Sequence, residues 1–169
     1  IDASMVAVLK QVGAAWSPNA SRPPLPTQAR LIEHPYTPVS ATSTSGTAGN
    51  AIDGINDTNT HTVWQTSGAL PQSVTLDLGT THPDVGMLSY VPQYVSGTGV
   101  TGGNITSYGI LVSTDGTTFT EATTGTWPAD GKLHTAIFAP VAARYVRLEA
   151  RAANGGAAIV TDITVGANR

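Results

Sequence analysis

Apolar and polar residues alternate along much of the chain after about residue 31. Val74, Leu76 and Leu78 alternate with polar neighbours, and the same period of two recurs in segments 108–112 and 145–151. Successive side chains of a strand point to opposite faces, so each segment predicts a strand with one buried face. No comparable helical period follows Trp16. The pattern therefore predicts an all-β chain.

Turn signals separate these segments. Dipeptides that are typical of turns fall at Leu78-Gly79, Asp115-Gly116 and Asp130-Gly131. We expect a break in the strands at each of them. Short strands with regular turn punctuation are typical of an antiparallel β-sandwich or jelly roll.

The first 30 residues have a different pattern. Residues 1–16 carry a helical apolar stripe, with Asp2 or Ser4 available as N-cap: Met5, Val8, Leu9, Val12 and Trp16. We interpret this helix as the end of an upstream domain; the alternative is that it packs on the sandwich. Residues 17–30 contain four prolines and predict a semi-rigid linker. The expected boundaries are thus 1–16, 17–30 and 31–169.

Composition limits the classes of function. Charged residues make up 11% of the 169 residues and the net charge is −3, so neither nucleic acid nor an anionic membrane is an expected partner. Without cysteine there is no disulfide and no thiolate metal site. We find no signal peptide and no apolar run of about 20 residues, the length that a membrane span needs. The abrupt start at Ile1 suggests a fragment of a longer protein.

Residues 50–64 form the most polar cluster in the chain. Carboxylates, amides and hydroxyls alternate there without helical or strand period, around a glycine at position 54. Calcium takes six to eight oxygen ligands, and glycine lets the chain turn sharply between them. The segment therefore predicts either a cation-binding loop or an ordinary surface loop with Asx turns.

Catalytic patterns are weak. The segment 97–102 fits GxGxxG, but a strand rather than a helix is expected after it, so we interpret it as a hairpin loop. Four histidines, at 34, 61, 82 and 134, lack zinc spacing, and we expect His134 to be a surface or satisfied structural residue. Asp77 and Asp115 occupy strand and turn positions. We expect no active site in this chain.

Several motifs together resemble one family. In order and spacing the chain resembles the discoidin, or coagulation factor 5/8 type C, family and its bacterial branch, the family 32 carbohydrate-binding modules. The resemblance covers about residues 31–167 and implies an eight-stranded sandwich whose loops gather at one end. The motifs that carry it are Ala51-Ile52-Asp53-Gly54, Thr62-Val63-Trp64, Val74 to Gly79, Val112 to Gly116 and Ala143 to Leu148.

The resemblance also implies a structural Ca²⁺ site. Two departures from the family pattern leave its ligands open. The loop before Trp64 is longer than usual, so Thr58 and Thr62 compete for one ligand role and Asp57 is an additional candidate. The last acid of the site is Asp rather than Glu. Bound calcium would tie the first loop to the last strand. The candidate ligands are Asn50, Asp53, Ile55, Asp57, Thr58, Thr62, Thr161 and Asp162.

The sugar site that the family implies is altered here. Gln65 and Gln93 stand where His and Arg are usual, and the late loop at 154–158 offers no aromatic ring. Glutamine can still donate to and accept from sugar hydroxyls, and a tyrosine can stack on a sugar face. The candidate sugar-binding residues are His61, Gln65, Gln93 and Tyr94.

The function that the resemblance implies is binding rather than catalysis. We expect a non-catalytic carbohydrate-binding module of a secreted, extracellular bacterial glycoside hydrolase, of the α-L-fucosidase kind, with the catalytic domain upstream. The glycan would end in galactose, fucose or a related sugar. The alternative is a structural sandwich, packed on the catalytic domain, with a degenerate sugar site. Membrane binding is disfavoured because the loops lack apolar spikes with basic neighbours.

Overall fold

The structure, a computed structural model, describes residues 32, 34–55, 62–95, 99–100 and 102–168. The predicted helix 1–16 and linker 17–30 lie outside the described residues. No helix long and apolar enough to cross a membrane occurs in the described part of the chain. The elements are β1 (Pro35–Tyr36), β2 (Ser40–Ser43), the 3₁₀ helix η1 (Ala48–Ala51), β3 (Trp64–Gln65), β4 (Gln72–Pro92), β5 (Tyr94–Val95), β6 (Gly99–Val100), β7 (Ile105–Ser113), β8 (Thr120–Thr126), β9 (His134–Ala153) and β10 (Ile159–Ala167).

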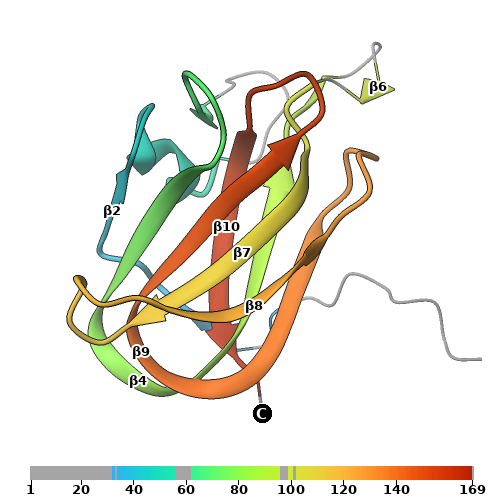
Figure 1. Cartoon of the computed structure of the whole chain (residues 1–169). Helices are drawn as coiled ribbons and strands as arrows, with labels where there is room; N and C mark the ends of the chain where they lie inside the picture. The colour runs from blue at the N-terminus through green and yellow to red at the C-terminus, as the bar shows by residue number, and fades with distance from the viewer. Residues whose placement is uncertain (1–31, 33, 56–61, 96–98, 101, 169) are drawn as a thin grey trace, which may run out of the picture.

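Two long strands, β4 and β9, pair with each other and bend together through both layers of a sandwich (Figure 1). In the first layer the order is β2, the first part of β4, the last part of β9, β7 and β8. In the second layer, β10 lies beside the last part of β4 and also pairs with the short strands β1 and β3. Every strand pairing in the described part of the chain is antiparallel, so the predicted antiparallel sandwich is confirmed.

The expected break at Leu78-Gly79 is wrong. Strand β4 continues through Gly79, whose φ of 79° lies in the region that glycine adopts without penalty. The register against β9 shifts between Asp77 and Val85, as it does at a β-bulge. The local turn signal is used to bend one strand from the first layer into the second. The other two predicted breaks are confirmed, since Asp115-Gly116 separates β7 from β8 and Asp130-Gly131 separates β8 from β9.

The core forms between the layers from the alternating apolar positions. Leu76, Ile110 and Leu148 of the first layer and Leu88 and Val165 of the second belong to one apolar cluster, and each is at least 97% buried. Burying apolar side chains is the main favourable term in folding, at about 25 cal/mol per Å². The predicted strands with one buried face are therefore confirmed.

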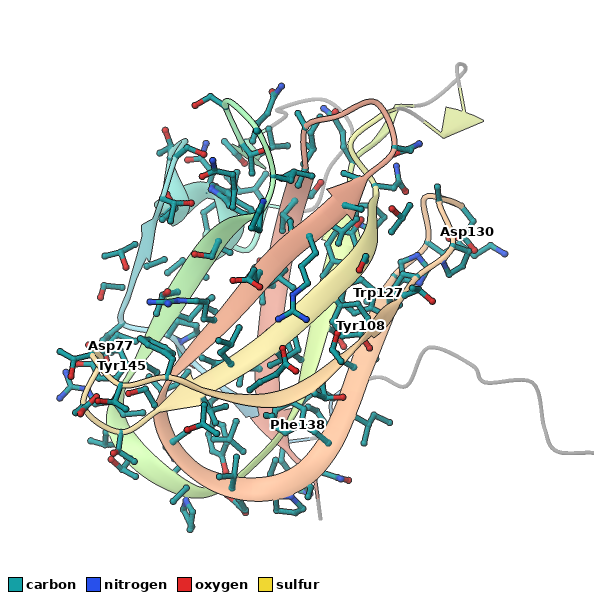
Figure 2. All side chains as sticks on the ribbon, in the orientation of Figure 1. Asp77, Tyr108, Trp127, Asp130, Phe138 and Tyr145 are labelled. Carbon is teal, nitrogen blue, oxygen red and sulfur yellow. The ribbon has the colours of Figure 1, made fainter. Side chains whose placement is uncertain are left out.

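An aromatic group extends the core toward the β8–β9 loop. Trp127 stacks on Tyr108 with ring centroids 3.7 Å apart (Figure 2). The ring centroid of His134 lies 5.7 Å from that of Trp127 and 5.9 Å from that of Tyr90. His134 is only 8% exposed, and its Nε2 lies 3.1 Å from Asp130 Oδ1. Burial lowers the pKa of His134, against the opposing charge of Asp130. Of the two roles expected for His134, the structural one is confirmed.

Candidate functional site

Strand β10 brings Gln65 and Gln93 to one end of the sandwich. Trp64 of β3 and Pro92 of β4 are both opposite Val160 of β10, on its two sides. Gln65 follows Trp64 in β3, and Gln93 follows Pro92 at the end of β4. Because β3 and β4 are both antiparallel to β10, they run in the same direction, and the two glutamines flank the start of β10 at the same level. With strands about 4.8 Å apart, their backbones are about 10 Å apart. The structure thus places together two candidate residues that are 28 positions apart in the sequence.

The other two sugar-site candidates are only partly described. Tyr94 begins β5, which pairs with β6 through Tyr94 opposite Val100, but its side chain lies outside the described part. His61 lies outside the described residues altogether. The expected hairpin is confirmed in part: Gly99–Val100 form β6, which pairs with β5, whereas residues 97, 98 and 101 lie outside the described residues. Strand β7, not a helix, follows, so the described residues after this hairpin offer no helix N-terminus to a phosphate.

Backbone rather than side chains forms the surface next to the two glutamines. The amide of Gly103 donates to the carbonyl of Asn154 at 2.6 Å, and that of Ile159 donates to the carbonyl of Gly103 at 2.8 Å. A Cβ on Gly103, where φ is 95°, would lie 2.4 Å from Ile159 Cγ1. The nearby rings of Trp64 and Trp127 are buried, so neither offers a stacking face to a sugar. Among the described residues, this surface therefore offers a ligand mainly polar groups.

Two carboxylates from distant segments meet beside η1. The Asp162 carboxylate on β10 accepts a hydrogen bond from the backbone amide of Gly54, and it lies close enough to Asp53 for the two charges to repel. Burial, and then the charge of Asp53, raise the pKa of Asp162, against the hydrogen bonds from Ile163 and Gly54. The Asp53 carboxylate itself accepts from the amide of Ile55 at 2.9 Å. The first loop and the last strand are thus joined at a pair of like charges.

Two threonines are further candidate ligands for a cation. Thr62 Oγ1 is buried and has no hydrogen-bond partner among the described residues, which is costly for a hydroxyl. Thr161 is the extra residue of a bulge, because the β10–β4 register shifts between Val160 and Asp162. A bulge removes its residue from the ladder and can re-aim its backbone groups. The ligand roles of these two threonines stay predictions.

The structure describes only some of the remaining candidate metal ligands. Asn50 lies in η1 and its Nδ2 donates to the carbonyl of Val63 at 3.0 Å, which holds the loop closed. Asp57 and Thr58 lie outside the described residues. No group of three or more His, Asp or Glu side chains suited to a metal occurs in the described part of the chain. A cation here would need carbonyl and hydroxyl oxygens beside two carboxylates, a set that suits calcium better than zinc.

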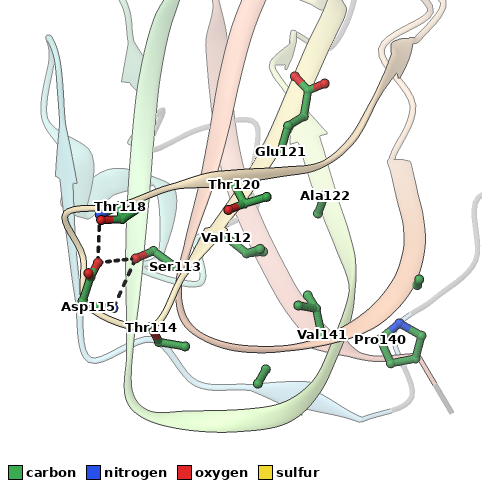
Figure 3. A pocket seen from close by; sticks show the side chains of 12 residues that line it. Val112, Ser113, Thr114, Asp115, Thr118, Thr120, Glu121, Ala122, Pro140 and Val141 are labelled. Atoms are coloured by element: carbon green, nitrogen blue, oxygen red, sulfur yellow. Dashed lines mark hydrogen bonds between the residues drawn. The ribbon is translucent and has the colours of Figure 1, made fainter.

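A groove of about 690 Å³ opens between β8 and the bend of β9, near the β7–β8 turn (Figure 3). Its acids are already engaged. The Asp115 carboxylate accepts hydrogen bonds from Ser113 Oγ and from the amides of Thr117 and Thr118, each at 2.8 Å, and these bonds lower its pKa. Glu121 is ion-paired with Arg151. Neither carboxylate has the arrangement of a general acid or base.

Asp77 is likewise structural. Arg144 binds it through Nε and Nη2, both at 2.8 Å, and Gly79 donates to it at 2.7 Å. The hydrogen bond from Arg144 is the main reason that the pKa of Asp77 is lowered. The expectation that Asp77 and Asp115 occupy strand and turn positions is confirmed.

Comparison with known proteins agrees with this architecture. Residues 37–163 match the family model of the F5/8 type C domain. Among solved structures, the module CpGH89CBM32-5 of Clostridium perfringens, in complex with GalNAc-β-1,3-galactose, is 36% identical with a TM-score of 0.67, over 76% of this chain and 94% of that one. The family 32 module of C. perfringens NanJ, in complex with galactose, is 28% identical with a TM-score of 0.65, over 78% of this chain and 97% of that one.

A longer relative also matches. The A type blood N-acetyl-α-D-galactosamine deacetylase of Flavonifractor plautii is 32% identical over an alignment of 148 residues. The match covers 80% of this chain and 18% of that protein. The chain therefore spans about a fifth of the length of this curated relative. The solved structures named above are carbohydrate-binding modules, whose sandwich fold is the one described here. By the extent of the family match, the chain belongs to the F5/8 type C domain family.

Proposed function

We propose that this chain is a non-catalytic carbohydrate-binding module that holds a terminal galactose-type sugar at the loop end. Gln65 and Gln93, with His61 and Tyr94, would form the site. The observation that carries the proposal is the register of β3 and β4 on β10, which brings Gln65, opposite Ile159, and Gln93, directly after Pro92, to the two sides of the start of β10. Amides about 10 Å apart can bracket one pyranose ring, because each can both donate to and accept from hydroxyls.

The sugar class is argued from relatives and from the surface. Two similar modules are described in complexes with galactose and with GalNAc-β-1,3-galactose. No atom lies within 4 Å of the place that a Cβ on Gly156 would take, and that leaves room beside this loop for a substituent such as an acetamido group. Fucose remains a further candidate from the sequence prediction. Without a charged donor, we expect weak affinity for a single sugar and a gain from multivalent glycans.

The proposed host is a secreted bacterial enzyme that acts on glycans. Its catalytic domain would lie upstream, and the module would raise the enzyme's concentration at a surface that displays the sugar. The curated relative, a deacetylase of N-acetylgalactosamine, supports a glycan-active host but not one particular reaction. The α-L-fucosidase association stays a prediction.

A structural calcium is the second part of the proposal. Asp53, Thr62, Thr161 and Asp162 would hold it, with the carbonyls of Asn50 and Ile55 and with Asp57 or Thr58 as further ligands. Its positive charge would offset the repulsion between Asp53 and Asp162 and join η1 to β10. Since it would bind the folded state only, a concentration 100 times its Kd would stabilise the fold by about 2.7 kcal/mol.

A glycan array with calcium present, followed by calorimetry on the hits, tests the sugar site. Gln65→Ala and Gln93→Ala should each remove a hydrogen bond worth about 0.5–1.5 kcal/mol and so weaken binding about 2- to 10-fold. Thr117→Ala, an exposed change at the other end of the sandwich, is the control and should bind normally. A flat array, or hits that neither glutamine variant weakens, would refute this site and favour the structural alternative.

Thermal unfolding with calcium and with a chelator tests the cation site. At about 2–4 °C per kcal/mol, saturating calcium should raise Tm by about 5–10 °C. Asp162→Asn should abolish this rise and, because it removes one of two repelling charges, should not lower the Tm in chelator. Asp115→Asn is the matched control: it loses turn hydrogen bonds and lowers Tm, but it should keep the calcium increment. An increment that survives in Asp162→Asn would overturn the assignment.

A further inference from the structure

Gln65 is an exposed residue between two buried neighbours. Trp64 is 0% exposed and Thr66 is 4% exposed, whereas Gln65 is exposed. Strand β3 has only two ladder positions on β10, where Trp64 is opposite Val160 and Gln65 is opposite Ile159. So short a pair can form only a few hydrogen bonds between strands. Backbone pairing of β3 by itself therefore fixes the place of Gln65 weakly.

The side chain of Thr66 extends this pairing by one residue. The amide of Thr66 donates to the carbonyl of Ala158 at 2.9 Å, and the amide of Ala158 donates to Thr66 Oγ1 at 2.8 Å. Ala158 is fully buried, so its amide has no water to bind in place of this hydroxyl. A buried donor without a partner is costly, so the bond strongly favours one position of Thr66. The contact with β10 thus continues past Gln65 to the next residue.

The segment 45–46 closes on Gln65 from the side of Trp64. Trp64 Nε1 donates to the carbonyl of Ser45 at 2.7 Å. A Cβ on Gly46, where φ is 75°, would lie 2.2 Å from the carbonyl oxygen of Gln65, so the backbones of these two residues are in close contact. The backbone of Gln65 is therefore held before it by the ring of Trp64 and after it by the hydroxyl of Thr66.

We propose that Thr66 is a positioning residue for sugar binding, whose hydroxyl holds the backbone of Gln65 in place through the amide of Ala158. The inference rests on the proposed function, in which Gln65 contacts the sugar. A side chain on a fixed backbone loses less conformational freedom on binding than one on a mobile segment, and this preorganisation lowers the cost of association. Without the hydroxyl, the segment must shift until the amide of Ala158 reaches water, and Gln65 moves with it.

A double-mutant cycle tests whether Thr66 acts through Gln65. Calorimetry is done with galactose or, where the glycan array favours another glycan, with that glycan. Thr66→Val keeps the size of the side chain but removes the acceptor, and it should weaken binding about 2- to 10-fold, as Gln65→Ala does. In the Gln65→Ala background it should cause no further loss, whereas in the Gln93→Ala background it should cause its full loss. Thr66→Ser, which restores the hydroxyl, should restore the Kd.

NMR relaxation of the chain without sugar is the second readout. The backbone order parameter of Gln65 should be about 0.85 in the unmodified chain and in Thr66→Ser, and it should fall toward the value of about 0.6 that marks flexible backbone in Thr66→Val. Ser113→Ala is the matched control at the other end of the sandwich, because Ser113 is 5% exposed and its Oγ accepts from the amide of Gly116 at 2.9 Å. This control should lower the Tm but change neither the Kd nor the order parameter of Gln65.

The results separate this proposal from the proposed function. A flat glycan array would overturn both, whereas normal binding with an unchanged Kd in Thr66→Val would overturn this one alone. A further loss in the Gln65→Ala background, or an order parameter of Gln65 that stays at about 0.85 in Thr66→Val, would also overturn it. If circular dichroism shows that Thr66→Val does not fold, Thr66→Ala is the second variant, because it removes the same acceptor.

Discussion

Tyr90 links the core to the loop end through one buried hydrogen bond. Its ring has no exposed surface, and its hydroxyl accepts a hydrogen bond from the amide of Ile105, the first residue of β7, at 2.9 Å. Tyr90→Phe keeps the ring but leaves this amide buried without a partner. An unsatisfied buried donor costs about 1–3 kcal/mol. At about 2–4 °C per kcal/mol for a domain of this size, we expect Tm to fall by about 3–10 °C.

The loss should have a distinct dependence on pH. Burial raises the pKa of the Tyr90 hydroxyl to about 12, against the hydrogen bond from Ile105. Since the unfolded hydroxyl titrates near 10, its contribution is complete below pH 10 and is lost as the pH rises toward 12. Urea unfolding at pH 6, 7.5 and 9 should therefore give the same difference between Tyr90→Phe and the unmodified chain.

Tyr108→Phe is the matched control for this variant. Tyr108 is 8% exposed and stacks on the same Trp127, but its hydroxyl has no hydrogen-bond partner among the described residues. Its loss of stability should stay below about 0.5 kcal/mol, as for changes that leave no buried group unpaired. Equal losses in the two variants, or a loss under 0.5 kcal/mol in Tyr90→Phe, would refute the role given to the hydrogen bond.

Two further predictions concern the same end of the sandwich. The buried His134 has a lowered pKa, so the unfolded state takes up a proton first as the pH falls through about 6.5, and stability should decline toward pH 5. In urea unfolding, His134→Gln should flatten this dependence of stability on pH, and an unchanged slope would contradict the argument. Gly103→Ala should lower stability by more than the about 1–2 kcal/mol that a left-handed residue costs, because its Cβ would meet Ile159. Gly156→Ala, at φ 90° with no atom within 4 Å of its Cβ, should lower stability by about that amount alone. Equal Tm values for the two variants would mean that Ile159 moves aside.

The alternation of the chain was enough to predict most strands and the core. Val74, Leu76 and Leu78 are buried because a strand presents every second residue to one face, and this rule needs no knowledge of partners. The same local reasoning failed at Gly79. A glycine with positive φ can end a strand or bend it, and the choice depends on whether β9 stays paired on the other side of the bend.

The candidate sites depended on tertiary structure to a greater degree. Residue types indicated oxygen ligands around Asp53, and the family resemblance indicated amides at Gln65 and Gln93. The partners of these residues come from β10, where Asp162 follows Asp53 by about 110 residues. Only strand pairing brings Asp162 to Gly54 and brings Gln65 and Gln93 to the two sides of the start of β10. Periodicity is a property of neighbouring residues and is written in the sequence, whereas a site is made where strands of distant origin meet, and that register is fixed by packing the whole sandwich.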